Sequence, residues 1–544
     1  MGLFSVSKRS RHTLEHVSGR SLAKNIWLQS VRLPLVLVAV LFAIIGSIFL
    51  YQSFAANANL PGDVNNDNIV NLSDLSILLS KWNTIDTSVD LNNDNEVGLS
   101  DLSILLSNWN KTYTPIPPTP PPVNTGFVGP LKVSANNRYL IDQSGKPFFM
   151  SADTSWSLLT KLSVADAKQY IDLRKAQGYN TIMTNIVFPS RIESGAHGTP
   201  FRGSDMTKPN ESYFMAVDEI LNYAKDQGVI MYVGSFWKTD NGGACISGFP
   251  VPAPFPSDNE MRSYASYLGS RYSNQTNLIW FNGGDGNPEC MNSQMANLGN
   301  YMKAAMPNIL ISYHTWGKAK WTSTQPWLGF NSMQYNSNSP PYSYADIRDL
   351  YGWSPTKPAF NMEPAYDPKA CCGSDQDTSE QENRRSGWWA ALSGALGVAY
   401  GGPRAAWFTG EVTNRIDTNA INRNGARHTG NINKIMSQLK WHLLEPDWNN
   451  ATVTGGRGTY GSANYATAAR ASDGSLIIAY TPQAGSLTVN LAKLAGAGKA
   501  QWYDPTTGNA IGSAMDINNS GSQNFVTPGN NNGGNQDWVL IVKR

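Results

Sequence analysis

Cysteine is scarce in this 544-residue chain, which contains four of them. Four are too few for the disulfide framework of an exported protein. Cys245 and Cys290 could pair, whereas the adjacent Cys371 and Cys372 cannot bridge in ordinary geometry without strain. None of the four has the histidine spacing of a zinc site. Cysteine chemistry is therefore a poor explanation of what this protein does.

Basic charge is also lacking outside the N-terminus. The formal net charge is +2, but residues 1–32 hold six lysines and arginines against one acidic residue, Glu15, which makes +5. The rest of the chain therefore carries −3. A protein that binds nucleic acid through its main body needs a basic face. We therefore expect no nucleic acid among its partners.

One long apolar run is present, from Leu33 to Tyr51, and it contains no charged residue. It is long enough to cross a bilayer as a helix, and the basic flank before it predicts a cytoplasmic N-terminus. We expect a basic cytoplasmic segment over 1–32, a transmembrane helix over 33–54 and the remainder at the cell surface. The alternative is a signal peptide cut near Ala56-Asn57-Ala58, which releases a secreted protein.

Two copies of an acidic, asparagine-rich stretch follow this run. "DVNNDNIVNLSDLSILLSKW" begins at Asp63, and "DLNNDNEVGLSDLSILLSNW" begins 27 residues later at Asp90. Side-chain oxygens stand at positions 1, 3, 5 and 12 of each copy, as in a calcium loop, which needs about six to eight oxygen ligands. The expected calcium ligands are Asp63, Asn65, Asp67, Asn71, Asp74, Asp90, Asn92, Asp94 and Asp101.

Each loop is followed by "LSDLSILLS", whose apolar spacing predicts a short amphipathic helix. Position 6 is Asn68 or Asn95 rather than glycine, and asparagine is the next best residue at positive φ. Duplicated loop-helix units of this kind over 60–112 resemble type I dockerin. The resemblance implies bound Ca²⁺ and a cohesin-type protein as partner. The alternative is a pair of polar turns between ordinary helices.

A proline-rich spacer, "TPIPPTPPPVNT", lies within 113–126 and precedes a larger domain. In that domain, apolar β-rich runs alternate with amphipathic helical stretches, which predicts a parallel sheet. Eight such runs predict an α/β fold, a (β/α)8 TIM barrel over 127–444. The predicted strands lie at 147–153, 179–188, 228–237, 277–285, 308–314, 330–336, 357–364 and 394–402.

The carboxyl ends of the strands carry the chemistry in such a barrel. The residues at those ends are Asp153, Asn185, Trp237, Asp285, His314, Gln334, Glu363 and Tyr400. Asp285 ends the fourth strand and Glu363 the seventh. Two carboxyl groups across a barrel mouth suit glycoside hydrolysis, since one protonates the leaving oxygen and the other attacks the sugar or activates water. The alternatives are structural ion pairs and metal ligands.

Five stretches of this domain resemble the apiosidase-like catalytic domain: "YLIDQSGKPFFMSADTSWSLL", "NLIWFNGGDGNP", "PWLGFNSMQYN", "KPAFNMEPAYD" and "RRSGWWAALSGALGVAYGG". Residues 445–544, with "WYDPTTG" and "QDWVLIVKR", resemble the β-sandwich that accompanies it and has been called a collagen-binding domain. The resemblance implies a glycoside hydrolase that releases apiose-linked side chains from a pectin. It implies Asp285 as the acid/base and Glu363 as the nucleophile, with no cofactor for catalysis.

The chain departs from this family's pattern at two places on the rim. Members commonly carry a histidine after the sixth and eighth strands, where this chain reads "QYNSNSPP" and "YGG". In the family these histidines shape substrate binding rather than the reaction, and this chain lacks them. We therefore expect a plant-type or other complex polysaccharide as substrate and leave the sugar open.

Further residues are expected to bind substrate. Asn282 and Asn361 could bind a sugar hydroxyl or only stabilise a loop, and His314 could orient Glu363, bind sugar or be structural. Candidates for stacking on sugar faces, with core packing as the alternative, are Trp156, Trp237, Trp280, Trp316, Trp327 and Trp407. The expected substrate-binding set is Asp153, Trp156, Asn185, Trp237, Asn282, His314, Gln334 and Asn361. The competing interpretation is a non-catalytic surface adhesin that binds glycan or collagen.

Overall fold

The computed structural model describes residues 62–65, 69–86, 88–91, 96–110, 128–187, 191, 194–237, 255–286, 289–334, 342–364, 366–367, 379–402, 416 and 421–544. The predicted basic segment, transmembrane helix and proline-rich spacer lie outside these ranges. Within them, no helix has both the length and the apolar character needed to span a bilayer. Cys290 is disulfide-bonded, and the other three cysteines lie outside the described residues. Two compact units, 1–119 and 120–544, are described separately below.

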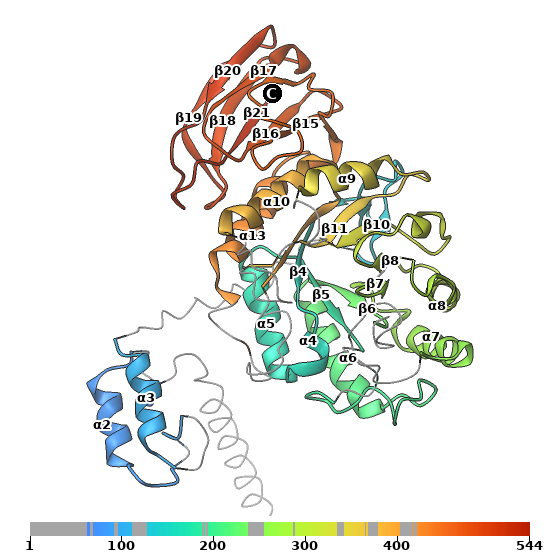
Figure 1. Cartoon of the computed structure of the whole chain (residues 1–544), viewed down its shortest axis with the longest axis vertical. Coiled ribbons are helices and arrows are strands. Elements are labelled where there is room, and N and C mark those ends of the chain that lie inside the picture. The colour runs from blue at the N-terminus through green and yellow to red at the C-terminus, as the bar shows by residue number, and fades with distance from the viewer. Residues whose placement is uncertain are drawn as a thin grey trace, which may run out of the picture. The chain divides into compact units, whose positions relative to one another are not determined.

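The first unit contains one helix in each copy of the duplicated stretch (Figure 1). Helix α2 is Leu72–Ser80 and α3 is Leu99–Ser107. Backbone hydrogen bonds join the two copies at equivalent positions. Asn83 N donates to Val97 O at 2.9 Å, and Asn110 N donates to Val70 O at 2.8 Å. The buried apolar side chains are Val70, Leu78, Val89, Val97 and Leu105. The duplicated sequence thus folds into two equivalent halves around one small core.

Eight parallel strands form the centre of the second unit (Figure 1). They are β4 Met150–Thr154, β5 Thr181–Asn185, β6 Ile230–Gly234, β7 Leu278–Gly283, β8 Ile311–His314, β10 Asn331–Gln334, β11 Ala359–Glu363 and β12 Gly397–Gly401. Each overlaps one of the predicted runs, so the strand prediction is confirmed. Six strands pair in the order β12-β4-β5-β6-β7-β8, and β10 pairs with β11.

Backbone hydrogen bonds connect these two sheets on both sides. Gly329 N donates to Ile311 O at 2.8 Å beside β10, and Leu396 N donates to Ala359 O at 2.9 Å beside β12. The eight strands therefore surround one interior, as in a TIM-like α/β domain.

Helices between the strands cover the outside of this barrel. They are α4 Leu158–Lys161, α5 Val164–Ala176, α6 Glu211–Asp226, α7 Asp258–Tyr272, α8 Asn292–Ala305, α9 Ser343–Gly352, α10 Glu380–Leu392 and α13 Asn424–Met436. The crossover from β8 to β10 is short and contains β9 Gly317–Lys318 and the 3-10 helix η2 Lys320–Thr324. A small antiparallel sheet of β1 Lys132–Val133, β2 Leu140–Ile141 and β3 Pro147–Phe148 precedes the barrel.

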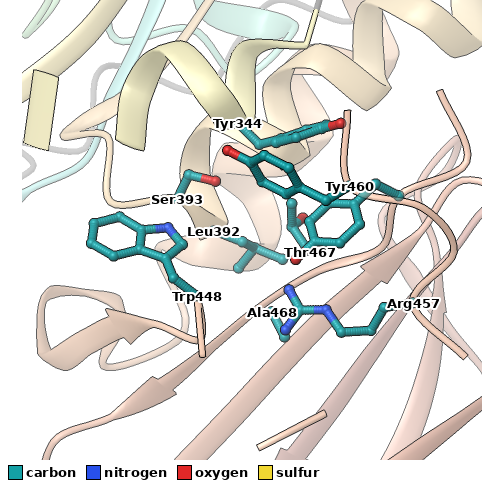
Figure 2. A pocket seen from close by; sticks show the side chains of 9 residues that line it. Tyr344, Leu392, Ser393, Trp448, Arg457, Tyr460, Thr467 and Ala468 are labelled. Carbon is teal, nitrogen blue, oxygen red and sulfur yellow. The ribbon is translucent and has the colours of Figure 1, made fainter. Parts of the chain in front are cut away.

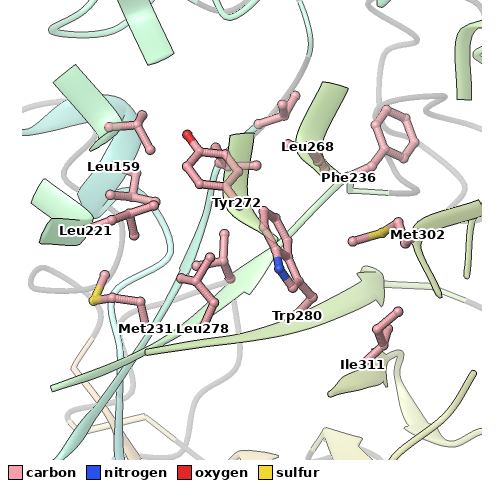
Figure 3. Close-up of a cluster of buried hydrophobic side chains, with 14 of the residues drawn as sticks. Leu159, Leu221, Met231, Phe236, Leu268, Tyr272, Leu278, Trp280, Met302 and Ile311 are labelled. Atoms are coloured by element: carbon pink, nitrogen blue, oxygen red, sulfur yellow. The ribbon is translucent and has the colours of Figure 1, made fainter. Parts of the chain in front are cut away.

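Side chains along a barrel strand alternate between two apolar cores, because successive Cβ atoms point to opposite faces. On β6, Tyr232 belongs to the core inside the barrel, whereas Met231 belongs to the core between the strands and helices. Figure 3 shows part of the outer core, where Trp280 of β7 lies among side chains from the helices. Both faces of each strand are buried, which explains the continuous apolar runs in the sequence.

The C-terminal part is a sandwich of two antiparallel sheets. One has the order β13-β15-β16-β21-β18-β19 and the other β14-β17-β20. The strands are β13 Leu444–Pro446, β14 Val453–Gly455, β15 Thr467–Ala471, β16 Leu476–Thr481, β17 Ser486–Asn490, β18 Gly498–Asp504, β19 Asn509–Ile517, β20 Ser522–Val526 and β21 Trp538–Lys543, with 3-10 helices η3 Trp441–Leu443 and η4 Leu491–Lys493. Side chains such as Val489, Trp502 and Phe525 form the core between the sheets.

A buried ion pair joins the sandwich to the barrel. Arg384 of α10 donates to Asp537 through Nε at 2.7 Å and Nη2 at 2.6 Å, and both side chains are fully buried. Tyr480 of β16 adds a hydrogen bond to Asp537 at 3.0 Å, and its ring stacks on Trp388 of α10. The sandwich is therefore fixed against α10 by a bidentate, charge-assisted contact.

His428 of α13 gives this junction a pH dependence that can be measured. Its Nδ1 lies 3.3 Å from Arg384 Nη1, and an arginine only donates, so Nδ1 is the acceptor of a neutral ring. Burial, with the charge of Arg384 beside it, lowers the pKa of His428 from 6.5 to about 4. Between these two values the unfolded chain binds the extra proton, so the free energy of unfolding should fall as the pH falls. His428→Gln should flatten that slope in melting curves at pH 7 and pH 5, and an unchanged slope would contradict the assignment.

Candidate active site

Glu363, the last residue of β11, lies between two hydrogen-bonding side chains. His314 Nε2, at the end of β8, is 2.6 Å from Glu363 Oε2, and Tyr366 Oη donates to Glu363 Oε1 at 2.6 Å. A carboxylate can only accept, so His314 Nε2 carries the hydrogen in this contact. Both oxygens of Glu363 are thus held in a defined orientation.

A glycine turn after β7 brings Asp285 to the same place. Gly283 and Gly284 have φ angles of 101° and 139°, which favour glycine. A Cβ on Gly283 would also lie 2.1 Å from His314 O, so no side chain fits there. Gly284 N donates to the same oxygen at 2.9 Å, which ties the turn to the end of β8. As a result, Asp285, His314 and Glu363 each place one ligand atom within 4.8 Å of the others.

Tyr366 is a permanent donor in this site. Burial raises its pKa well above 10, and the negative charge of Glu363 raises it further. Trp156 Nε1 donates in turn to Tyr366 Oη. The Tyr366 hydroxyl therefore accepts a hydrogen bond from Trp156 and donates its own hydrogen to Glu363.

Aromatic rings form a wall around His314. The ring of Trp237, which follows β6, lies 4.8 Å from that of His314, and the ring of Trp156, which follows β4, lies 5.3 Å away at a right angle. Both tryptophans are buried, at 4% and 1% exposure. They restrict the imidazole and exclude water from it rather than presenting an open stacking face.

Four buried amide side chains supply polar atoms at the strand ends. Among the described residues, Asn185 Oδ1, Asn282 Nδ2, Gln334 Oε1 and Asn361 Oδ1 have no hydrogen-bond partner. The other end of Asn282 is fixed, because Ser235 Oγ donates to its Oδ1 at 2.5 Å. All four atoms are buried, so the described structure does not present them to the solvent at the barrel mouth.

The structure keeps Asp153 out of this group, contrary to its expected role in substrate binding. Its carboxylate is fully buried, pairs with Arg174 Nε at 2.9 Å and accepts from Tyr170 Oη at 2.5 Å, both on α5. Ala152 before it points into the barrel interior, so Asp153 must point outward. Burial raises the pKa of Asp153 despite the neighbouring Arg174. Asp153 therefore joins β4 to α5.

The tryptophans marked as stacking candidates separate into different environments. Trp280 and Trp327 are fully buried in the core between strands and helices. Trp316, two residues after His314, is 43% exposed and bridges to the backbone of Gln334. Trp407 lies outside the described residues. Trp316 is therefore the exposed ring among the described candidates and the best placed for stacking.

Tyr366 was missed by the sequence reasoning. It lies three residues after Glu363 in "KPAFNMEPAYD", beyond the strand end, where periodicity no longer says which way a side chain points. The signal that could have found Tyr366 is its position within this stretch, which is one of the five that resemble the family.

Removing the Tyr366 hydroxyl should slow the reaction without unfolding the barrel. A hydrogen bond to a charged group contributes about 1.5–3 kcal/mol, so Tyr366→Phe should lower kcat by about 10- to 100-fold. Tyr301→Phe is a matched control, because Tyr301 donates to Asp258 at 2.6 Å on the surface. Steady-state kinetics on a cleaved polysaccharide would measure both, and equal rates in the two variants would contradict the role of Tyr366.

Asp285, His314 and Glu363 also form a group that could hold a metal ion. An imidazole nitrogen and two carboxylate oxygens are ligands that divalent cations accept. Within the described residues, the side-chain geometry alone therefore suits both metal binding and two-carboxylate hydrolysis.

Position 12 of each expected calcium loop is a fully buried aspartate. Asp74 accepts from Val64 N at 2.9 Å and Asn71 N at 2.8 Å. Asp101 makes the equivalent contacts with Leu91 N at 2.6 Å and Gly98 N at 2.8 Å. The described loop residues are Asp63, Asn65, Asn71, Asp74, Asp90 and Asp101, while Asp67, Asn92 and Asp94 lie outside the described ranges. Each carboxylate thus faces its loop from the start of the following helix.

Solved structures share the fold of the second unit. A glycoside hydrolase superimposes with a TM-score of 0.66 and 22% identity, covering 76% of this chain and 97% of its own. A glycoside hydrolase of family 5 from Bacteroides vulgatus ATCC 8482 superimposes with a TM-score of 0.65 and 21% identity, covering 76% of this chain and 93% of its own. At such identities the likeness shows the fold alone. A search of curated protein sequences found no match.

Family models match two successive parts of the chain. Residues 453–543 match the model "Putative collagen-binding domain of a collagenase". Residues 134–442, more than half of the chain, match the model "Apiosidase-like, catalytic domain", and this match contains Asp285, His314, Glu363 and Tyr366. The chain therefore belongs to the apiosidase-like family of catalytic domains and is a glycoside hydrolase.

Proposed function

We propose that this enzyme hydrolyses a complex polysaccharide with retention of configuration, using Glu363 as nucleophile and Asp285 as acid/base. The observation that carries the proposal is the pair of carboxyl groups with oxygen atoms within 4.8 Å of each other. Retaining enzymes place their carboxyl groups about 5–5.5 Å apart, whereas inverting enzymes need about 6.5–9.5 Å to admit a water molecule. The short separation supports direct attack on the sugar.

The two steps assign a different task to each side chain. In the first, Glu363 attacks the anomeric carbon while Asp285 protonates the departing oxygen, and a covalent glycosyl-enzyme forms. In the second, Asp285 takes a proton from water, which attacks the same carbon and releases Glu363. His314 and Tyr366 hold Glu363 in line for attack and stabilise its charge when it is regenerated.

Side chains of pectin, linked through apiose, are the first substrates to test. The absence of a histidine after Gln334 and after Tyr400 leaves the choice of sugar open within plant-type and other complex polysaccharides. The test is sugar release by the full chain from a panel of pectins, hemicelluloses and glucans. NMR of the released sugar identifies the anomer that forms first. Release of a product with retained configuration supports the proposal. Binding to a polymer without release would instead favour the adhesin interpretation.

The first unit is proposed as a calcium-dependent docking module for a cohesin-type protein. Its residues fit a cation, because Asp74 is fully buried and faces its loop, where it accepts hydrogen bonds from the backbone N–H groups of Val64, Asn65 and Asn71. Carboxylate and amide oxygens at this loop spacing are ligands that Ca²⁺ accepts. We further propose that the enzyme works outside the cell, either tethered or secreted, and the apolar run with its basic flank supports this location.

Calcium should stabilise the first unit selectively. At a free concentration of about 100 times Kd, a bound ion adds about 2.7 kcal/mol to the free energy of unfolding. Differential scanning calorimetry of the full chain should therefore show one transition that rises with Ca²⁺ and falls with chelator. The paired variant Asp74→Asn, Asp101→Asn should lose the effect. Asp86→Asn should keep it, because Asp86 pairs with Lys81 outside the loops. Insensitivity of wild type to chelator would refute the calcium loops.

A further inference from the structure

The segment that follows β11 carries Tyr366 and then Asp367, and it is fixed to the end of β12. Asp367 N donates to Gly401 O, in the last residue of β12, at 3.0 Å. The ring of Tyr366 lies directly on Gly401, since a Cβ there would come within 2.3 Å of that ring. The end of β12 therefore has room for Tyr366 only because it carries a glycine.

The carboxylate of Asp367 is buried and holds two further elements. Tyr400 Oη, on β12, donates to Asp367 Oδ2 at 3.2 Å, and Arg423 Nε, directly before α13, donates to Oδ1 at 3.3 Å. Gly425, in the first turn of α13, lies so close that a Cβ there would be 2.1 Å from Asp367 Oδ2. One carboxylate thus joins the segment that carries Tyr366 to a strand and to a helix.

Tyr400 continues these contacts into the wall of the barrel. The guanidinium carbon of Arg174 lies 5.4 Å from the ring centroid of Tyr400, and Arg174 pairs with Asp153 at 2.9 Å. The side chains of Arg174 and Asp153 are fully buried. Buried polar networks whose members are paired are rigid. Asp367 is therefore anchored to a rigid part of the barrel.

We propose that Asp367 is a positioning residue of the reaction, which keeps the Tyr366 hydroxyl on Glu363 by fixing the segment that carries Tyr366. The inference rests on the proposed role of Glu363. Tyr366 Oη donates to Glu363 Oε1 at 2.6 Å. A misplacement of about 1 Å in such a group can cost about 100-fold in rate. Loss of the Asp367 carboxylate should therefore act on Glu363 through Tyr366.

A double-mutant cycle tests whether Asp367 acts through Tyr366. Asp367→Ala in the full chain should lower kcat for sugar release from pectin by about fivefold or more and change KM by less than about twofold. In a chain that already carries Tyr366→Phe, the same change should have almost no further effect on kcat. Asp367→Asn should restore most of the rate, because its amide oxygen can accept from Arg423. An equal loss of kcat from Asp367→Ala in both backgrounds would overturn the proposal.

Asp447→Ala is the matched control for removing a buried aspartate. Arg457, at the junction of barrel and sandwich (Figure 2), pairs with Asp447 at 3.1 Å, and both side chains are buried. The control should lower the melting temperature at least as much as Asp367→Ala and leave kcat within about twofold. If Asp367→Ala does not fold, the cycle is run with Tyr400→Phe, which removes one donor to Asp367 and keeps the ring. Its loss of kcat should likewise vanish in the Tyr366→Phe chain.

The imidazole proton of His314 gives a readout that needs no turnover. His314 is fully buried and its Nε2 lies 2.6 Å from Glu363 Oε2, so its proton NMR signal should appear far downfield and be missing from His314→Gln. Asp367→Ala and Tyr366→Phe should shift this signal in the same direction, because Tyr366 and His314 share one carboxylate, whereas Asp447→Ala should leave it in place. An unshifted signal in Asp367→Ala would overturn the proposal. This result does not depend on cleavage of pectin, so failure of the positioning role and failure of the proposed reaction are distinguishable.

Discussion

Replacing Glu363 by glutamine should reduce kcat by at least about 10⁴-fold while the protein stays folded. The amide keeps the shape of the side chain but cannot form the glycosyl-enzyme, so the first step is lost. Glutamine can still receive the hydrogen from Tyr366 on its carbonyl oxygen, which should preserve the melting temperature to within a few degrees. The measurement is sugar release from the polysaccharide that wild type cleaves, beside a melting curve of each variant.

Glu219→Gln is the control for the loss of one glutamate. Glu219 lies on α6 with its side chain 58% exposed and pairs with Lys168 on the surface. Its replacement should leave kcat within about twofold, because an exposed ion pair contributes at most about 1 kcal/mol to stability. If the two variants lost activity alike, or if Glu363→Gln stayed active, the nucleophile would have to be another residue.

Asp285→Asn should give a different kinetic signature from Glu363→Gln. Loss of the acid penalises substrates whose leaving oxygen needs a proton, and has less effect on an aryl glycoside whose phenolate leaves unaided. The variant should therefore lose most of its activity on polysaccharide and keep much of the first step on the activated substrate. A uniform loss on both substrates would argue that Asp285 does not act as the acid.

The second large effect concerns stability at the junction between barrel and sandwich. Asp537→Ala leaves the guanidinium of Arg384 buried without its carboxylate, and removal of one partner of a buried pair costs about 3–5 kcal/mol. The same change also removes acceptors for Tyr480 and Asn531. We expect the denaturant midpoint to fall markedly, together with the first transition in calorimetry of the second unit.

Asp516→Ala is the matched control in the same sandwich. Asp516 pairs with Lys499 at 2.7 Å on neighbouring strands, but its side chain is 87% exposed. Its removal should cost less than about 1 kcal/mol, since solvent screens the charges in both states. Similar losses in the two variants would show that the Arg384 pair does not hold the domains together.

Much of the candidate site could be predicted from local sequence. The local sequence did not show whether each side chain points into the barrel or away from it. The ends of apolar runs predict Asp285, Glu363 and His314 as site residues, and the structure brings these three together. The same argument predicts Asp153 as a site residue, yet Asp153 faces Arg174 on α5. The end of a strand tells how far along the barrel axis a residue lies. The choice between interior and exterior depends on the register of the strand, which a single-residue shift reverses.

The sequence by itself determined the repeat of the first unit, the positions of the eight barrel strands and two carboxylates, one just after β7 and one at the end of β11. These features depend on spacing along the chain and on local backbone preference, which are visible in the letters. Tertiary structure alone decided that His314 and Tyr366 hold Glu363 and that Asp153 is structural. Those relations join residues far apart in the chain, and burial and side-chain direction exist only after the chain has folded.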